Sequence, residues 1–420
     1  MPSPKIPFNP DLYQHLCDRL QQTETGQIPF AEFMETALYH PQWGYYASTA
    51  KQIGPKGDFV TSPHMGPDFG ELLGEQLREL WRHLGKPDRY DLVEMGAGQG
   101  LLAKDILGYL RREDPHCFAT VHYTIIETAT ALRAFQQQFL NPQFPELLGD
   151  KIGDRLQWRD LDDLPENSIT GCFFSNELVD AFPVHRVSVQ NGELLENYVT
   201  LPPQGDRETP HPEAPFVNQW GPPSTPAIAH YFQRLNIDLT QPPYPDGYIT
   251  EVNLAAPQWL EKVAIALRHG YILTIDYGYT AQRYYQPART EGTLQCYTQH
   301  AHHNDPYVNL GYQDLTAHVD FTTLEQVGNS LGLTNVGFTQ QALFLMSLGL
   351  GDRLSGLATD DYPTGNQLQT LLRRRDSLQR LIDPLGLGNF GVLVQCKSDP
   401  DDDPLASLPL RGLTVPEWTS

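Results

Sequence analysis

A glycine-rich turn lies in the sequence Asp91-Leu-Val-Glu-Met-Gly-Ala-Gly-Gln-Gly-Leu-Leu102. The apolar residues before it predict a buried strand, and Leu101 predicts the start of a helix. Glycine lets a backbone turn tightly and come close to a ligand, because it has no side chain. An acidic residue just before the turn can hold a polar, cationic part of that ligand. The turn therefore predicts a cofactor site with five candidate contacts: Glu94, Gly96, Ala97, Gly98 and Gly100.

The spacing of these glycines indicates which cofactor fits. A dinucleotide-binding turn has the pattern G-x-G-x-x-G and needs a small residue at the position of Leu101. An acid-x-G-x-G-x-G pattern after a strand is instead typical of class I S-adenosylmethionine (SAM) methyltransferases. SAM has no pyrophosphate to place on the helix N-terminus. The turn therefore predicts SAM, and an ordinary strand-turn-helix without a ligand is the alternative.

Two further acids follow the next predicted strands, which span residues 121–127 and 155–159. Glu127 ends the first of them, where a carboxylate can accept two hydrogen bonds from a ribose diol. Asp160 follows the second, where it can accept a hydrogen bond from an adenine amino group while Leu161 packs on the ring. Each feature alone also fits an ordinary surface loop, so their order along the chain carries the prediction.

Thr61 and Ser62 precede a strongly amphipathic helix predicted over residues 66–84. Backbone N–H groups at a helix start bind anions, and hydroxyl groups can add hydrogen bonds. These two residues are therefore predicted to meet the carboxylate of the cofactor's methionine part. A helix cap without a ligand is the alternative.

The segment Ser175-Asn-Glu-Leu-Val-Asp-Ala-Phe-Pro183 directly follows a predicted strand over residues 170–175. Many methyltransferases bind the methyl acceptor at this position. Glu177 and Asp180 can pair with a guanidinium group, which stays protonated and has five donors in a fixed fork. Asn176, Glu177 and Asp180 are therefore the predicted catalytic residues. They would position one nitrogen for in-line displacement at the sulfonium methyl. An Asn/Asp-capped helix start is the alternative.

Strands alternate with helices from residue 90 onward, which predicts a doubly wound α/β fold with a seven-stranded, mostly parallel sheet. The predicted strands span residues 91–95, 121–127, 155–159, 170–175, 271–276, 333–339 and 390–396. Predicted helices between them span residues 101–112, 129–140 and 256–268. In such sheets ligands bind at the carboxyl ends of the strands. The fold therefore places the glycine turn and the acids that follow the strands along one edge.

The chain is predicted to divide into three regions. Residues 1–89 form a helical region with a cofactor-side loop, in which residues 11–40 have helical periodicity. Residues 90–397 form the SAM methyltransferase domain. The acidic tail, residues 398–420, is predicted to be disordered. Three insertions are expected within the domain: a proline-rich surface segment at about 201–247, a His/Tyr-rich segment at 277–330, and two helices within 341–385.

The composition narrows the class of protein. A net charge of −22 disfavours nucleic acid as a partner, because nucleic-acid binders usually have a basic surface. Five scattered cysteines form no C-x-x-C pair, and the run His300-Ala-His302-His303 matches no common zinc spacing, so no metal is predicted. No apolar run is long enough to cross a membrane. No targeting segment is recognised at the N-terminus, so a cytoplasmic protein is expected.

Several motifs together resemble the MidA-like methyltransferase family, which includes the mitochondrial complex I assembly methyltransferase. The motifs keep the family order over about residues 25–397 and lie at 57–63, 69–72, 93–100, 176–183, 276–278, 292–294 and 314–321. The resemblance implies a class I SAM methyltransferase fold with SAM as the cofactor. It also implies that Asp320 and His318 lie near the acceptor residues. For the mitochondrial relatives it implies dimethylation of an arginine on a complex I subunit during assembly.

The predicted function is therefore SAM-dependent methylation of arginine in a partner protein, such as a subunit of a complex I-like NADH dehydrogenase. Two alternatives remain open. One is a SAM-binding assembly factor whose role does not require catalysis. The other is an amino-group methyltransferase acting on nucleic acid. Against the second alternative, the chain has no aromatic residue directly after Asn176 that would stack a flipped base.

Overall fold

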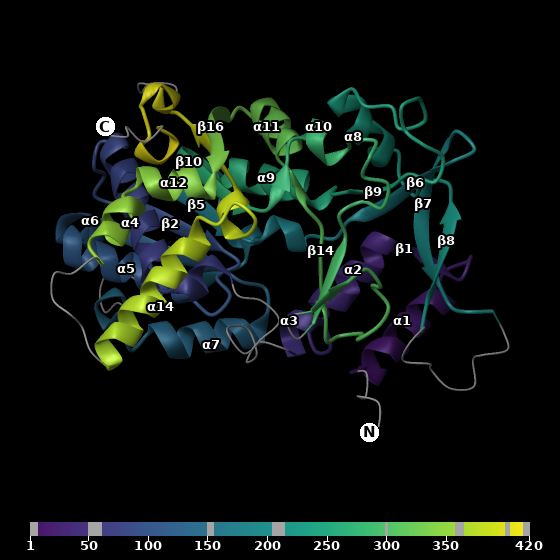
Figure 1. Ribbon diagram of the computed structural model, residues 1–420, viewed down its shortest axis with the longest axis horizontal. Helices are drawn as coiled ribbons and strands as arrows, with labels where there is room; N and C mark the ends of the chain where they lie inside the picture. Colours follow the sequence, from purple (N-terminus) through teal and green to yellow (C-terminus); the bar gives the residue numbers. More distant parts are fainter. Residues whose placement is uncertain are drawn as a thin grey trace.

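Seven strands form the central sheet of the computed structural model (Figure 1). In spatial order they are β16 (Thr334–Gln340), β17 (Gly391–Lys397), β10 (Leu267–Asp276), β5 (Ile169–Asn176), β2 (Tyr90–Met95), β3 (Val121–Ile126) and β4 (Leu156–Arg159). Only β17 runs antiparallel to its neighbours within this sheet. The predicted seven-stranded, mostly parallel sheet is confirmed. The structure describes residues 7–48, 61–148, 155–203, 215–298, 301–357, 365–399 and 404–414.

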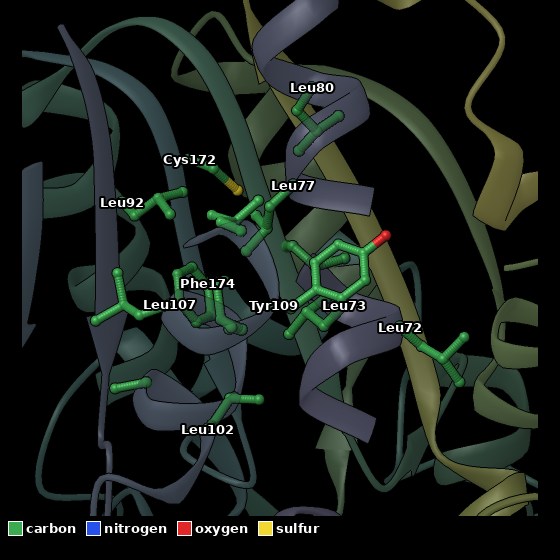
Figure 2. Close-up of a cluster of buried hydrophobic side chains, with 14 of the residues drawn as sticks. Leu72, Leu73, Leu77, Leu80, Leu92, Leu102, Leu107, Tyr109, Cys172 and Phe174 are labelled. Atoms are coloured by element: carbon green, nitrogen blue, oxygen red, sulfur yellow. The ribbon is translucent and has the colours of Figure 1, made fainter. Parts of the chain in front are cut away.

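Both faces of the central sheet are covered by helices, so neighbouring residues of one strand enter different cores. Leu92 and Phe174 pack on the face of α4 (Pro67–His83) and α5 (Leu101–Glu113), as Figure 2 shows. Val93 and Phe173 pack on the other face, against α9 (Ala255–Ala266) and α11 (Phe321–Ser330). Near-continuous apolar runs are typical of strands buried on both faces, which is why these strands could be predicted.

A crevice is expected where the chain changes direction across this sheet. From β2 the chain continues to β3 and β4 on one side, whereas β5 and β10 lie on the other side. The segments that follow β2 and β5 therefore diverge at the carboxyl ends of these two strands. The glycine turn follows β2, and the predicted acceptor segment follows β5.

A second, antiparallel sheet lies beside the first (Figure 1, teal). It contains β1 (Gln27–Pro29), β7 (Glu193–Thr200), β6 (His185–Gln190), β9 (Ile249–Val252) and β8 (Val217–Gly221). Three N-terminal helices accompany it, namely α1 (Pro10–Gln22), α2 (Phe30–Tyr39) and α3 (Tyr45–Ser48). The predicted helical periodicity of residues 11–40 is thus confirmed, with the short strand β1 between the two helices.

The prediction of a surface insertion at 201–247 is wrong for much of that segment. It contributes β8 to the second sheet and contains α8 (Ala227–Leu235), which buries Ile228, Tyr231 and Phe232. Residues 204–214 of this segment lie outside the described residues. The short amphipathic helix was not predicted because the segment is rich in proline. Its buried residues lie at positions i, i+3 and i+4, which is the spacing of one helix face.

Two boundaries near the C-terminus also differ from the predictions. The described part of segment 341–385 contains three helices rather than the two predicted: α12 (Gln341–Ser347), α13 (Leu350–Ser355) and α14 (Asn366–Leu381). The tail is ordered over residues 404–414, because Leu405 and Leu410 are 2% exposed and pack into the core of the central sheet. Residues 400–403 and 415–420 lie outside the described residues.

The segment 277–330 is not a single insertion. Its last part, α11, packs against the central sheet, and its earlier part forms small strand pairs near the second sheet. The remaining helices and strands of the described residues are η1 (Ser62–Met65), α6 (Pro115–Thr120), α7 (Thr130–Leu140), η2 (Pro145–Leu147), η3 (Leu161–Asp163), η4 (Val179–Ala181), β11 (Gly278–Tyr279), α10 (Ala281–Tyr284), β12 (Gln295–Thr298), β13 (Ala301–His303), β14 (Asp314–Thr316), β15 (Val319–Asp320), η5 (Leu387–Asn389), η6 (Leu405–Ser407) and η7 (Arg411–Leu413). Among the described residues, no helix has the length and apolar character to cross a membrane.

Candidate active site

A cavity of about 1340 Å³ lies at the carboxyl ends of the central strands, at the predicted edge. Ligand pockets commonly hold about 300–1,000 Å³, so this cleft has room for a cofactor together with a substrate side chain. It brings together most of the predicted site residues: Thr61, Glu94, Gly96, Ala97, Gly98, Glu127, Asp160, Leu161, Asn176, Glu177, Asp180 and His318. Three predicted residues do not line it: Ser62, Gly100 and Asp320.

The glycine turn has a left-handed backbone at each glycine, with φ angles of +72° at Gly96, +51° at Gly98 and +77° at Gly100. Residues with side chains rarely adopt these angles. A Cβ atom at Gly96 would also come within 2.8 Å of the Leu178 side chain. A Cβ atom at Gly98 would meet no atom within 4 Å. Since Gly98 also lines the cleft, it leaves space there for a ligand.

Glu94 is the buried acid before this turn, with 3% of its surface exposed. Burial raises the pKa of its carboxyl to about 7, although the hydrogen bond from the Tyr123 hydroxyl (2.6 Å) acts against the rise. No ion pair to Glu94 occurs among the described residues. A buried carboxylate is costly without a cation beside it. The site therefore fits the cationic part of SAM, as the sequence predicts.

Glu127 and Asp160 lie at the neighbouring strand ends and are linked by Arg133. Arg133 donates one hydrogen bond to the Glu127 carbonyl oxygen (2.6 Å) and another to the Asp160 carboxylate (2.7 Å). Glu127 accepts from the Ala129 N–H (2.9 Å), and burial raises the pKa of its carboxyl. Leu161 packs at the edge of the neighbouring core. These positions are consistent with the predicted ribose and adenine contacts, whose roles stay predictions.

Gln136 is a contact that the sequence prediction missed. Its side-chain amide donates to the carbonyl oxygen of Gly98 (2.8 Å) and to the Glu127 carboxylate (3.1 Å). Its side-chain oxygen accepts from the Trp158 indole (3.0 Å). The residue lies inside α7, where its type and spacing give no signal of this role. It ties the glycine turn to the end of β3.

Ser62 differs from its predicted role as a cofactor contact. Its hydroxyl is buried and donates to Gln341 (3.2 Å), away from the cleft. Thr61 does line the cleft, and its hydroxyl lies 2.8 Å from a ring nitrogen of His64. The Ser62 backbone N–H reaches toward Glu177 (3.4 Å), so this turn contacts the predicted acceptor segment. Residues 57–60 of the same motif lie outside the described residues.

Glu177 and Asp180 follow β5 and lie in the cleft. Burial, with the nearby Asp180 charge, raises the pKa of the Glu177 carboxyl to about 8. Burial also raises the pKa of Asp180 to about 6, although a hydrogen bond from the Tyr277 hydroxyl opposes the rise. Among the described residues, no basic side chain forms an ion pair with either acid. The two acids are therefore suited to a cation, and their predicted role at the methyl acceptor stays a prediction.

Glu177 has a strained backbone, with φ at +53°. Such angles are uncommon for residues other than glycine and Asn, and strained residues of this kind are enriched at functional sites. The Glu177 N–H donates to the Ile275 carbonyl oxygen (2.9 Å). Its carboxylate accepts from the Asn176 side-chain amide (3.0 Å). The neighbouring strand β10 thus helps to hold the Glu177 carboxyl group in the cleft.

Asp276 organises the acceptor segment from the end of β10. Its buried carboxylate accepts from the backbone N–H groups of Leu178 (3.2 Å), Val179 (2.9 Å) and Asp180 (3.3 Å). Burial raises the pKa of Asp276 well above its usual range. The sequence prediction gave Asp276 no role, although its position at the end of a predicted strand was a usable signal.

Several tyrosines line the part of the cleft around Glu177 and Asp180, which we call the acceptor half. The sequence prediction missed them. Tyr39 on α2 donates to the Ala181 carbonyl oxygen (2.9 Å), and its ring lies 5.3 Å from that of Tyr46 on α3. Tyr277, Tyr279 and Tyr297 also line the cleft, and Tyr277 and Tyr297 lie near enough to Asp180 for its charge to raise the pKa of their hydroxyls. Aromatic faces attract cations. The N-terminal helices α2 and α3 thus contribute residues to the cleft that the sequence did not predict.

His318 and Asp320 have different environments. His318 lines the cleft and stacks on Tyr279, with ring centroids 5.0 Å apart. Burial and the charge of Arg289 lower its pKa to about 4, so the ring is neutral at pH 7. Asp320 instead caps α11 by accepting from the Thr322 N–H (3.0 Å) and also accepts from the Tyr231 hydroxyl (2.9 Å). Its role here is structural.

The described residues contain no group of three His, Cys, Asp or Glu side chains that is arranged to hold a metal ion. His300, the first histidine of the His-rich run, lies outside the described residues.

Comparison with known proteins agrees with the chemistry of the cleft. Residues 72–339 match a family model described as "Putative S-adenosyl-L-methionine-dependent methyltransferase". The chain is similar to a crystal structure from Burkholderia thailandensis that contains S-adenosyl-homocysteine. That likeness has a TM-score of 0.77 and 29% identity, and it covers 96% of this chain and 97% of that chain.

Two curated relatives share most of the chain. The protein from Drosophila melanogaster named "Protein arginine methyltransferase NDUFAF7 homolog, mitochondrial" is 29% identical over 383 residues, which cover 88% of this chain and 81% of the relative. The human "Protein arginine methyltransferase NDUFAF7, mitochondrial" is 29% identical over 406 residues, with coverages of 92% and 84%. The mitochondrial names of these relatives contradict the prediction of a cytoplasmic protein.

The family match spans more than half of the chain and includes the glycine turn, the acids at the strand ends and the acceptor segment. The likeness to a structure with S-adenosyl-homocysteine extends over nearly the whole fold. The predicted resemblance, fold class and cofactor are confirmed. The chain belongs to the MidA-like family of SAM-dependent methyltransferases.

Proposed function

We propose that this methyltransferase transfers the methyl group of SAM to a guanidinium nitrogen of an arginine in a partner protein. The observation that carries the proposal is a pair of carboxyl groups, on the buried Asp180 and the partly buried Glu177, which have no basic partner among the described residues. The relatives named as protein arginine methyltransferases support the same acceptor.

The acceptor half of the cleft suits a guanidinium group. Arginine stays protonated in proteins, so it would supply the positive charge that these carboxyl groups lack. Its entry would lower the pKa of both acids and favour their ionised forms. Charge-assisted hydrogen bonds would then hold the guanidinium in one orientation. One nitrogen would be directed toward the part of the cleft around Glu94 and the glycine turn, which we call the cofactor half.

The reaction needs one proton acceptor as well as orientation. Bound SAM supplies an electrophilic methyl group on a sulfonium. The guanidinium nitrogen forms the new N–C bond with its electron pair, and the electrons of the broken C–S bond remain on sulfur. The nitrogen then loses a proton, which we assign to the carboxylate of Asp180 or Glu177. Both groups are shifted toward holding a proton at neutral pH.

The proposed partner is a protein that presents an exposed arginine. The family resemblance favours a subunit of a complex I-like NADH dehydrogenase, methylated during assembly. The net charge of −22 suits a partner with a basic surface around that arginine. Nine acidic residues line the cleft, compared with one lysine.

The test compares proteins from cells that carry the wild-type chain, the double variant Glu177→Gln/Asp180→Asn, or no copy of the gene. Mass spectrometry of the NADH dehydrogenase subunits should find a methylated arginine only with the wild-type chain. Calorimetry should show that the double variant still binds S-adenosylhomocysteine, so its defect lies in the acceptor half. A chain-dependent methyl group on lysine, histidine or a nucleic-acid base, with none on arginine, would refute the proposal.

A further inference from the structure

Two arginines beside the cleft, Arg283 and Arg289, have no role in the proposed function. Their guanidinium carbons lie 4.4 Å and 4.6 Å from the ring centroid of Tyr279, which lines the cleft. Arg283 is on α10, and Arg289 lies in the segment that follows this helix. Two positive charges are thus held at one ring of a cleft whose charged lining residues are nearly all acidic.

A stack of aromatic rings connects these arginines to the acceptor half. The ring of Tyr279 stacks on that of His318, with centroids 5.0 Å apart. The His318 ring contacts Tyr277 edge to face at 4.9 Å, and the Tyr277 hydroxyl donates to Asp180. Burial and the charges of both arginines lower the pKa of His318, as expected if the arginines lie close to this stack. The two arginines therefore lie at one end of the stack and Asp180 at the other.

Both guanidinium groups can bind a further anion. Arg283 is exposed, and its guanidinium has no hydrogen bond or ion pair among the described residues. Arg289 donates from Nη1 to the carbonyl oxygens of Arg283 (2.7 Å) and Tyr284 (2.6 Å), which fixes its position. A ring face attracts the charge of a guanidinium without using its N–H donors. Glu291, an exposed acid close in sequence, forms no ion pair with either arginine.

We propose that Arg283 and Arg289 bind an acidic side chain of the partner protein, located within a few residues of the methylated arginine. The inference rests on the proposed function, because it concerns the segment that carries the target arginine. Glu177 and Asp180 hold the target guanidinium at one end of the ring stack, and the arginine pair holds the acid at the other end.

The charge distribution explains why this pair selects one kind of segment. A chain of net charge −22 with an acid-lined cleft repels an acidic segment in general. The arginine pair is a local exception, so an acid is favourable at one position of the segment and unfavourable elsewhere. An extended segment advances about 3.3–3.6 Å per residue. An acid one to four residues from the target arginine can therefore span the ring stack. The partner that fits has a mainly basic surface with one acid near its arginine.

The experiment measures peptide binding to the full chain saturated with S-adenosylhomocysteine, by NMR titration. The reference probe is a nonapeptide with blocked ends, an arginine at its centre and glycine elsewhere. Eight further probes each replace one glycine with aspartate. Wild-type protein should bind most aspartate probes more weakly than the reference, because of the general repulsion. At one position or two neighbouring positions, aspartate should instead increase affinity about threefold, the effect of an exposed ion pair.

Arg283→Glu tests the charge directly, because the Arg283 guanidinium holds no hydrogen bond among the described residues whose loss would disturb the fold. The variant should lose the gain from aspartate at the selected position and should gain affinity from lysine there instead. Its affinity for S-adenosylhomocysteine should not change. Arg375→Glu is the matched control, because Arg375 is also exposed and lies on α14, far from α10 (Figure 1). It changes the net charge equally and should keep the wild-type preference.

The outcomes separate the two proposals. A gain from aspartate that moves to lysine in Arg283→Glu, and stays in Arg375→Glu, supports the inference. If aspartate increases affinity at no position, or if Arg283→Glu keeps the gain, the inference about the arginine pair is overturned while the proposed function stands. If the reference peptide binds no better than a peptide with glycine at its centre, the proposed acceptor site is itself overturned.

Discussion

Carboxyl groups that have raised pKa values and no ion-pair partner among the described residues lie at two separate points of the cleft. Glu94 lies in the cofactor half and Glu177 and Asp180 in the acceptor half, and burial raises the pKa of all three. An unpaired buried acid destabilises a fold, so such groups are usually tied to function. One point fits the cationic cofactor and the other fits a cationic side chain. In the proposed reaction the two cations meet between these acids.

The glycine turn permits a direct test of the cofactor half. Gly98→Val should abolish measurable binding of S-adenosylhomocysteine, because the side chain would occupy open space in the cleft. Gly85→Val is the matched control. Gly85 also has a left-handed backbone (φ +75°) with no atom near its missing Cβ, but it is exposed at the end of α4. Both variants carry similar backbone strain, so calorimetry should show a loss of binding only for Gly98→Val. Equal affinities in the two variants would show that the turn is not the cofactor site.

At the level of elements, the central sheet was predictable and the second sheet was not. The inner strands β2, β5, β10 and β17 are buried over nearly their whole length, so each is a largely apolar run that stands out from its surroundings. Strands β6 and β7 are half-polar and were missed. A usable signal was nevertheless present, because Asn191-Gly192 between them is a strong hairpin signal, with φ of +52° and +77°. The missed elements matter because they belong to the half of the molecule that completes the acceptor site.

The same reasoning explains which site residues could be predicted. The glycine turn and the acids at strand ends are local patterns, so their roles can be inferred from neighbours in the sequence. Asp314 and Tyr46 are hydrogen-bonded although 268 residues separate them. No local pattern indicates such a pairing, which depends on how the N-terminal helix α3 packs beside β14.

A cluster of ion pairs joins the C-terminal helices to α4 near the cofactor half. Asp68, 4% exposed in the first turn of α4, accepts from Arg353 on α13 (2.7 Å) and from Arg374 on α14 (2.7 and 2.9 Å). Burial acts to raise the pKa of Asp68, but the hydrogen bonds from these arginines outweigh it and leave the pKa lowered. Since α14 also packs against η1, the cluster supports the turn that carries Thr61.

Asp68→Asn should therefore lower the free energy of unfolding by about 2 kcal/mol at pH 7, less than for a fully buried pair because Arg374 is half exposed. The control is Asp162→Asn, which breaks an exposed ion pair with Lys262 and should cost less than about 1 kcal/mol. Urea denaturation of both variants measures the difference. Equal losses would mean that the cluster contributes no more than a surface ion pair.

The whole molecule combines a large negative charge with buried acids, and both features set how stability depends on pH. Glu94, Glu177 and Asp180 have pKa values of about 7, 8 and 6, compared with ordinary values near 4. Between pH 5 and 8 the folded chain therefore binds more protons than the unfolded chain. The stability associated with these groups is complete below their unfolded pKa values and is lost as pH rises through their folded values. Repulsion at a net charge of −22 acts in the same direction.

The ligand-free protein should consequently be less stable at pH 8.5 than at pH 5.5, measured by the midpoint of thermal unfolding. Glu177→Gln separates the local effect from general repulsion, because it removes one acid whose pKa is raised and only one unit of charge. This substitution should reduce the difference in the free energy of unfolding between pH 5.5 and pH 8.5 by on the order of 2 kcal/mol. Glu75→Gln removes the same charge from an acid whose pKa is lowered, since the hydrogen bonds from Tyr109 and Arg78 outweigh burial. Glu75 is ionised at both pH values, so this variant should shift both midpoints alike. If Glu177→Gln and Glu75→Gln change the pH dependence identically, that dependence comes from net charge. The raised pKa values of the acids in the cleft would then contribute nothing to it.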